Sequence, residues 1–458
     1  MIAVRTLTLP VACRRWSSLA TVRGACWHAL PGGSSITSWP LLRLSWPYPL
    51  WVGSAVSGFG AEIAELALPL LALLSLSASA SEVGFLRVAQ FLPFLLATLP
   101  IGVLVDRRPR RLLALMVGAD VGRFALIAVV PIAVWTGVAG MGLLYAIVFA
   151  AGTLSVLFQH ADFALLPGLV RADQLVDANG KIAAAASVNE IGGRGLGGLL
   201  VQAISAPVAM AVNAVAFLLS AASLSRIRRA VEPDVVPGKN RNSGADVREG
   251  LRVAWRNRYI RGLLGEATTF NLFNEIFVLG LMLYLVRGLH LGAGAVGLVF
   301  AAGGVGSFVG AWFGPRVTGR FGYGRVLLVT MAVGNTAPLA VSVITRPGVP
   351  VLPVLCAIFV TMGVGIGVAN VHAVSLRQTG LREDLRGRVN AAYRLISWGA
   401  VPIGAGCGGL LAAHAGAPTA MLVGAGGMVA ATLWVAGSGI PALRGIHDPR
   451  VRAQLGGS

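Results

Sequence analysis

Apolar residues are distributed along the chain in long blocks that are separated by short polar intervals. Twelve blocks are long enough to cross a bilayer as a helix, which takes about 20 mainly apolar residues. Barrel strands would instead alternate apolar and polar residues over about 10 positions. The pattern therefore predicts an all-α polytopic membrane protein whose twelve transmembrane helices lie near residues 50–74, 83–105, 112–134, 139–161, 182–204, 207–225, 262–286, 293–314, 325–345, 350–374, 391–413 and 418–438.

The composition of the 458 residues agrees with this class. Hydrophobic residues make up 56% and charged residues 12%, whereas soluble globular proteins contain about 25% charged residues. The four cysteines show no paired metal-ligand spacing, so we expect neither a disulfide framework nor a metal site, and no cofactor.

The basic residues account for the formal net charge of +19, with 37 Lys and Arg against 18 Asp and Glu. Between the predicted helices they fall almost entirely in alternate connections, and the opposite connections contain only Arg287 and Arg346. The positive-inside rule therefore places both termini in the cytoplasm, and the charge excess does not indicate nucleic-acid binding. Because the excess of Ala, Gly and Arg is typical of a GC-rich bacterial genome, we expect a multi-pass protein of a bacterial cell membrane.

The polar intervals also predict how the chain is divided. A charged middle interval separates two groups of six predicted helices, and part of it, residues 246–259, could form an amphipathic helix on the membrane. The predicted parts are a basic, disordered tail (1–47), a six-helix half (48–226), a cytoplasmic middle loop (227–260), a second six-helix half (261–440) and a cytoplasmic tail (441–458).

The two halves contain related sequences in their fifth predicted helices. At one constant offset, Asn179 matches Asn390, and the sequence GGLL at 197–200 matches the same letters at 408–411. Repeated halves are typical of secondary transporters, whose substrate site lies between the repeats. The sequence therefore predicts two pseudo-symmetric halves.

The connection after the second predicted helix reads GVLVDRRPRR. It resembles the pattern G-x-x-x-D-R/K-x-G-R/K-R/K of the major facilitator superfamily. The stretches 165–179 and 376–394 resemble the branch of that family that includes siderophore and macrolide exporters. The resemblance implies the major facilitator fold. The matching residues of the connection are Gly102, Asp106, Arg107, Arg110 and Arg111, with Pro109 in place of a glycine.

In this family the acid of that connection meets the start of the eleventh helix, which here contains Gly387, Arg388 and Asn390. The free N–H groups and the dipole of a helix N-terminus favour a nearby carboxylate. The resemblance therefore implies that Asp106 is part of a cytoplasmic gate that holds the halves together while the site faces outward. The alternative is that the arginines at 107–111 only set the topology.

Charged residues inside membrane helices are costly and are therefore candidates for function. The spacing of Asp120 with Arg123, and of Glu190 with Arg194, suits structural ion pairs on one helix. The carboxylates of Glu62, Glu65 and Glu275 have no cationic neighbour in sequence. The resemblance implies that they lie on helices that line the central cavity. The candidates for proton coupling and for the substrate cavity are Glu62, Glu65, Asp120, Arg123, Glu190, Arg194, Asn271, Asn274 and Glu275.

Burial in an apolar medium favours the protonated form of a carboxylate. We therefore predict that Glu62, Glu65 or Glu275 carries a coupling proton. At the end of the fourth predicted helix, Gln159 takes the place of the family's acid, and Asp162 follows three residues later.

These features favour a secondary active exporter of a small, partly apolar molecule, such as a drug or siderophore. Protons would drive it, and it would act as a monomer in the lipid bilayer. The chain has no G-x-x-x-x-G-K-S/T loop and no D-D-x-x-D pair, which argues against nucleotide-driven transport and against a metal-dependent membrane transferase. We therefore do not expect an enzyme. An importer of a metabolite and a transporter-like sensor without flux stay open.

Overall fold

The computed structural model describes residues 48–169, 175–227, 243–343, 350–379, 381 and 383–445. The predictions for the tail 1–47, for residues 228–242 of the middle loop and for residues 446–458 lie outside this part of the chain. Within it, all regular secondary structure is helical.

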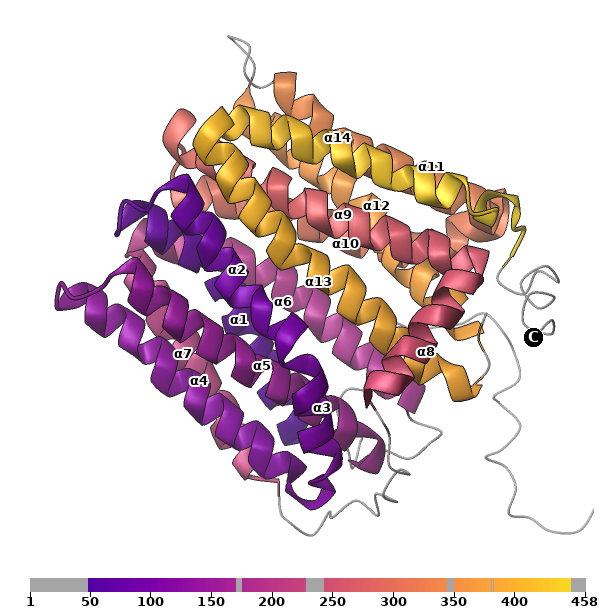
Figure 1. Ribbon diagram of the computed structural model, residues 1–458. Coiled ribbons are helices and arrows are strands. Elements are labelled where there is room, and N and C mark those ends of the chain that lie inside the picture. Colours follow the sequence, from indigo (N-terminus) through magenta and orange to yellow (C-terminus); the bar gives the residue numbers. More distant parts are fainter. Residues whose placement is uncertain are drawn as a thin grey trace, which may run out of the picture. The chain divides into compact units, whose positions relative to one another are not determined.

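Each predicted apolar block overlaps a helix of the structure, and the block at 83–105 is divided between two helices (Figure 1). The helices of the first group are α1 (Tyr48–Leu74), α2 (Ala80–Leu96), α3 (Thr98–Asp106), α4 (Leu112–Trp135), α5 (Met141–Leu169), α6 (Leu175–Ala203) and α7 (Ala206–Ser225). After them come α8 (Ser243–Arg256), α9 (Arg258–Leu283), α10 (Ala293–Phe321), α11 (Tyr323–Thr336), α12 (Val351–Thr379), α13 (Glu383–Ala415) and α14 (Ala417–Ala436).

The predicted number of twelve transmembrane helices is not confirmed. Among the described residues, 10 helices are long and apolar enough to cross a membrane, or 11 if α2 and α3, which meet at a bend of 45°, form one span. Pro100 follows the bend, and it has no N–H with which to bond the carbonyl of Leu96. Helix α6 does not meet the apolar criterion, because it contains polar and charged residues that include Glu190 and Arg194.

The helix contacts follow a pseudo-symmetric pattern. In the first group α1 packs on α6 and α7, and α2 packs on α5. The equivalent helices repeat this, since α9 packs on α13 and α14, and α10 packs on α12. Between the groups, α2 packs on α13 and α6 packs on α10. The pattern agrees with the repeat in the sequence, while the domain boundaries themselves stay a prediction.

Two glycine pairs mark close approaches between the groups. A Cβ atom on Gly84 would lie 2.7 Å from the Cα of Gly409, and one on Gly198 would lie 2.7 Å from the Cα of Gly297. Small residues of this kind let membrane helices pack backbone to backbone. Because Gly198 and Gly409 occupy equivalent positions of the repeat, the close approach explains why both copies carry glycine there.

We expect the substitution Gly297→Val to force α6 and α10 apart and to lower the stability by about 1–3 kcal/mol, the usual cost of overpacking. The measurement is thermal unfolding in detergent, followed by loss of the monodisperse peak in size-exclusion chromatography. The control is Gly426→Val on α14, where an added Cβ would meet no atom within 4 Å. Equal melting of the two variants would contradict the tight crossing.

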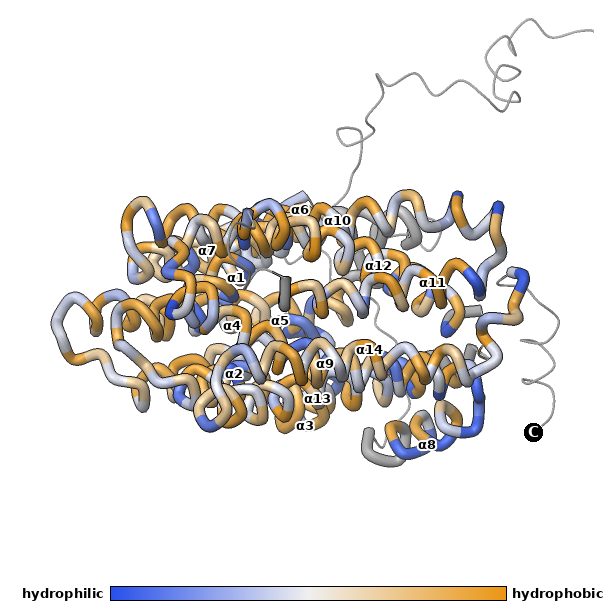
Figure 2. Tube along the Cα trace, turned by 90° about the horizontal axis from the view of Figure 1, so that it is seen from above, coloured by the Kyte–Doolittle hydropathy of each residue, from blue (hydrophilic) through white to orange (hydrophobic). Residues whose placement is uncertain are grey.

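The predicted amphipathic helix of the middle loop exists, with different limits. It forms α8, which ends at Arg256, whereas Tyr259 already belongs to α9. In Figure 2, α8 carries both strongly hydrophilic and hydrophobic residues. Its buried side packs on α13, where Nη1 of Arg388 lies 2.6 Å from Oε2 of Glu249.

Candidate functional site

Arg87 on α2 is buried between the two helix groups and was absent from the sequence-based candidates. Its Nη2 lies 3.0 Å from Oε1 of Glu275 on α9, and its Nε donates to Oε2 of the same carboxylate at 3.3 Å. Its Nη1 donates to Glu65 on α1, whose other oxygen accepts a hydrogen bond of 2.7 Å from Nε2 of Gln90. One guanidinium therefore joins carboxylates from both groups.

Arg194 on α6 forms the second centre of charge. Its Nη1 lies 3.4 Å from Oε1 of Glu190, one turn away on the same helix, which confirms the predicted pair. Its Nε donates to Oε2 of Glu62 on α1 at 2.9 Å. The arginine that interrupts the glycine-rich run of α6 thus connects α6 to α1.

These contacts correct the prediction that three of the carboxylates lack a cation. Glu65 and Glu275 pair with Arg87, and Glu62 pairs with Arg194. Arg87 lies within the second apolar block, 83–105. A list of all charged residues inside the predicted helices would therefore have included this cation. We call this cluster the charge network; it consists of Glu62, Glu65, Arg87, Glu190, Arg194 and Glu275.

The charge network contains four carboxylates and two guanidiniums, and thus an excess of acid. Uncompensated charge is costly at membrane depth. The excess can be balanced by bound protons or by a cationic ligand. The arrangement is therefore suited to taking up positive charge.

A cavity of about 710 Å³ adjoins the charge network. Asn271 and Asn274 line it from α9. Nδ2 of Asn271 donates a hydrogen bond of 2.7 Å to the carbonyl of Ser397. Oδ1 of Asn274 is buried without a hydrogen-bond partner in the described part of the chain. The cavity extends to Arg377 and Arg394, near the end of α12 and the beginning of α13. The glycine pairs lie near the opposite ends of their helices, so the halves close on one side of the cavity.

The predicted pair of Asp120 and Arg123 on α4 is confirmed as a buried ion pair. Asp120 also accepts a hydrogen bond of 2.6 Å from Ser220 on α7. The guanidinium of Arg123 lies 4.5 Å from the ring centre of Phe158 and 4.3 Å from that of Phe217. Because its contacts lie within the first half, this pair acts as a structural link between α4, α5 and α7.

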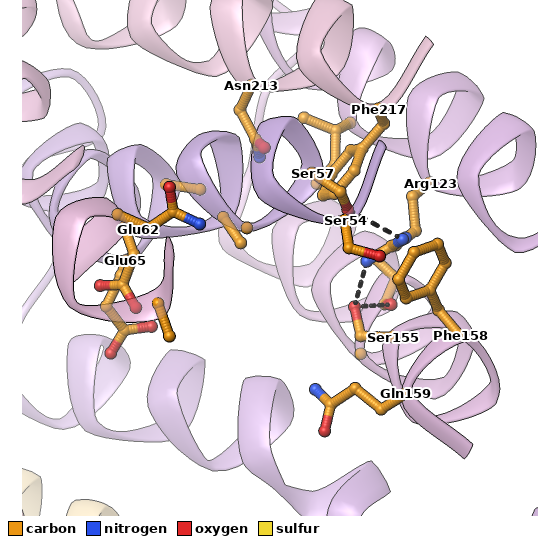
Figure 3. Close-up of a pocket in the computed structure, with 18 of the residues that line it drawn as sticks. Ser54, Ser57, Glu62, Glu65, Arg123, Ser155, Phe158, Gln159, Asn213 and Phe217 are labelled. Atoms are coloured by element: carbon orange, nitrogen blue, oxygen red, sulfur yellow. Dashed lines mark hydrogen bonds between the residues drawn. The ribbon is translucent and has the colours of Figure 1, made fainter. Parts of the chain in front are cut away.

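A second cavity, of about 390 Å³, lies among α1, α2, α4, α5, α6 and α7. Figure 3 shows Glu62 and Glu65 at one end of it and Arg123, Phe158 and Gln159 at the other. The charge network therefore adjoins a cavity inside the first half as well as the cavity that reaches α12 and α13.

The predicted gate contact is not present in this conformation. Asp106 is the last residue of α3, is exposed, and makes no hydrogen bond or ion pair with the residues that the structure describes. Helix α13 begins at Glu383, so the N–H groups of Gly387, Arg388 and Asn390 lie beyond its first four, unbonded positions. Arg107, Arg110 and Arg111 are exposed, and Gly102 faces His160. A gating role of these residues stays a prediction.

Among the described residues, no three His, Cys, Asp or Glu side chains are grouped so that they could hold a metal ion. The site is defined by buried and half-buried ion pairs, amides and cavities between two pseudo-symmetric helix groups. This architecture is that of a secondary membrane transporter, in which the site lies at the interface of repeats.

Sequence comparison identifies the family. The profile of the transmembrane secretion effector family matches residues 36–451, and the chain belongs to this family of the major facilitator superfamily. It is 28% identical over 363 residues to the multidrug efflux pump Tap of Mycobacterium tuberculosis. This alignment covers 76% of this chain and 82% of the relative. It is 25% identical over 365 residues to macrolide efflux protein A of Streptococcus pyogenes, covering 78% of this chain and 87% of the relative.

Solved structures confirm the fold. The inward-facing structure of a bacterial homologue of the iron transporter ferroportin matches 86% of this chain and 98% of its own length, with a TM-score of 0.65 and 18% identity. The nucleoside transporter NupG matches 86% of this chain and 99% of its own length, with a TM-score of 0.61 and 11% identity. The predicted major facilitator fold is thereby confirmed.

Proposed function

We propose that this transporter exports small, partly apolar molecules, such as drugs, in exchange for protons. The observation that carries the proposal is the excess of carboxylates over guanidiniums in the charge network. The export activities named for the relatives, macrolide efflux and multidrug efflux, support the direction and the class of substrate.

The coupling follows from the position of Arg87. Its ion pairs with Glu65 and Glu275 tie α1 and α2 to α9. A proton on either carboxylate removes one charge and weakens the tie, which lets the two halves change their packing. Release of the proton on the other side of the membrane restores the ion pair and resets the transporter.

The test is transport by the purified protein in inside-out vesicles with an imposed pH gradient. With an acidic lumen, we expect a fluorescent amphipathic dye to accumulate inside, and addition of the dye should make the lumen more alkaline. Protein-free vesicles are the control. Movement of the dye only in the opposite direction would indicate an importer, and binding without flux would indicate a sensor.

We further propose that both termini are cytoplasmic, that the protein lies in the bacterial cell membrane, and that it works as a monomer. The alternation of arginine-rich connections supports the orientation. Reporter fusions after Ser77 and after Gly238 should report opposite sides of the membrane. Agreement between the two reporters would overturn this topology.

A further inference from the structure

Asp162 on α5 is a carboxylate within the first half that has no counter-ion among the described residues. Its Oδ1 accepts a hydrogen bond of 3.4 Å from the hydroxyl of Ser54 on α1. In the part of the chain that the structure describes, no Lys, Arg or His nitrogen lies within 4.0 Å of its oxygens. Arg123, which lines the same cavity, is already paired with Asp120. Asp162 is half-buried, and a carboxylate at membrane depth is costly without a counter-ion, so this position is suited to a cation that comes from outside the protein.

The cavity around Asp162 has the size and walls of a ligand site. Its volume of about 390 Å³ lies within the usual range of small-molecule cavities, about 300–1,000 Å³. The rings of Phe91, Phe158 and Phe217 already contact the guanidiniums of Arg87 and Arg123, so the aromatic residues act here as apolar walls for the body of an organic molecule. The aromatic residues that line the cavity are Trp51, Phe91, Phe94, Phe158 and Phe217.

Three buried polar atoms of the lining residues have no hydrogen-bond partner in the described part of the chain. They are the donors Nε1 of Trp51 and Nε of Arg123, and the acceptor Oδ1 of Asn213. Buried polar groups in native proteins are normally satisfied. Oδ1 of Asn213 can accept from an ammonium group, whereas the two donors call for an acceptor, such as an ether or carbonyl oxygen, on the body of the same ligand.

We infer that this cavity binds an amphipathic organic amine, with the protonated amine on Asp162 and the apolar body against the aromatic walls. The inference rests on the proposed function, since it names the substrate class of the exporter. The other end of the cavity is lined by Glu62 and Glu65 (Figure 3). A bound amine therefore shares its cavity with two carboxylates of the charge network.

The test compares two fluorescent probes that differ in one group: a dansyl amide with an aminopentyl chain and its hydroxypentyl analogue. Both are titrated into the purified full-length protein in detergent at neutral pH. We expect the wild type to bind the amine at least about 10-fold more tightly than the alcohol, since a hydrogen-bonded charge pair contributes that much. Asp162→Asn should remove this preference and leave binding of the alcohol unchanged.

Two further variants make the result specific. Asp162→Glu keeps the charge and should keep the preference for the amine, which separates loss of charge from misfolding. Glu266→Gln removes another buried carboxylate, on α9 in the second half, and should also keep the preference. Equal binding of the two probes by the wild type, or a preference that survives in Asp162→Asn, would overturn the inference.

The outcome is independent of proton coupling, because binding in detergent needs no pH gradient. If the two probes bind equally well but vesicles still pump a neutral dye, the inference fails and the proposed function stands. If the amine binds through Asp162 but no substrate moves in vesicles, the proposed function fails instead.

Discussion

Replacement of Arg87 by methionine should destabilise this protein by about 3–5 kcal/mol, the usual cost of removing one partner of a buried ion pair. The guanidinium is the shared partner of Glu65 and Glu275, and its side chain is only 8% exposed. Methionine fills much of the same space without charge, so it leaves two carboxylates facing each other. The measurement is thermal unfolding in detergent, together with the yield of monodisperse protein.

Restoring the balance of charge should restore part of the stability. We expect the triple variant Arg87→Met, Glu65→Gln, Glu275→Gln to unfold at a higher temperature than Arg87→Met alone, because no unpaired charge is left. Arg316→Met, at an exposed arginine of α10, is the matched control and should melt like the wild type. If Arg87→Met also melts like the wild type, the two carboxylates are already protonated in the resting protein.

The substitution Glu275→Gln should abolish proton-driven export and leave substrate exchange intact. Glutamine resembles the protonated acid in size and polarity, so the cavity keeps its shape while the site loses a titrating group. Exchange of substrate for substrate needs no net proton movement, whereas uphill export does. The measurement is dye transport in vesicles with and without a pH gradient, repeated over a range of pH values.

The matched control for this prediction is Glu249→Gln, which removes a carboxylate of α8 that pairs with Arg388 outside the charge network. It should keep the wild-type pH profile. Export by Glu275→Gln with an unchanged pH profile would exclude this residue as the proton carrier, and the same assay on Glu62→Gln and Glu65→Gln would then decide between the other two candidates.

The positions of the helices could be predicted because each span needs a long apolar block, and every block overlaps a helix. The number of spans could not be fixed in the same way. The bend between α2 and α3 depends on proline, and α6 combines the length of a span with polar residues that face other helices and cavities. The length and the hydropathy of a block predict neither the bend nor the contacts that the polar residues of α6 make.

The ion pairs within single helices show where sequence reasoning about the site succeeds. Glu190 and Arg194 lie one turn apart, and Asp120 and Arg123 lie three residues apart, so helical geometry alone predicts these pairs. Arg87 and Glu275 are 188 residues apart in sequence. Their pairing depends on how two helix groups pack, and no local pattern contains that information.

The ion pair between Arg87 and Glu275 has a consequence for the biosynthesis of the chain. During translation the N-terminal half is made first, so Arg87 enters the membrane while Glu275 is still unmade. Glu275 then enters the bilayer when its counter-ion is already in place. A second half synthesised alone would have to insert this carboxylate without the cation that lies beside it in the complete protein.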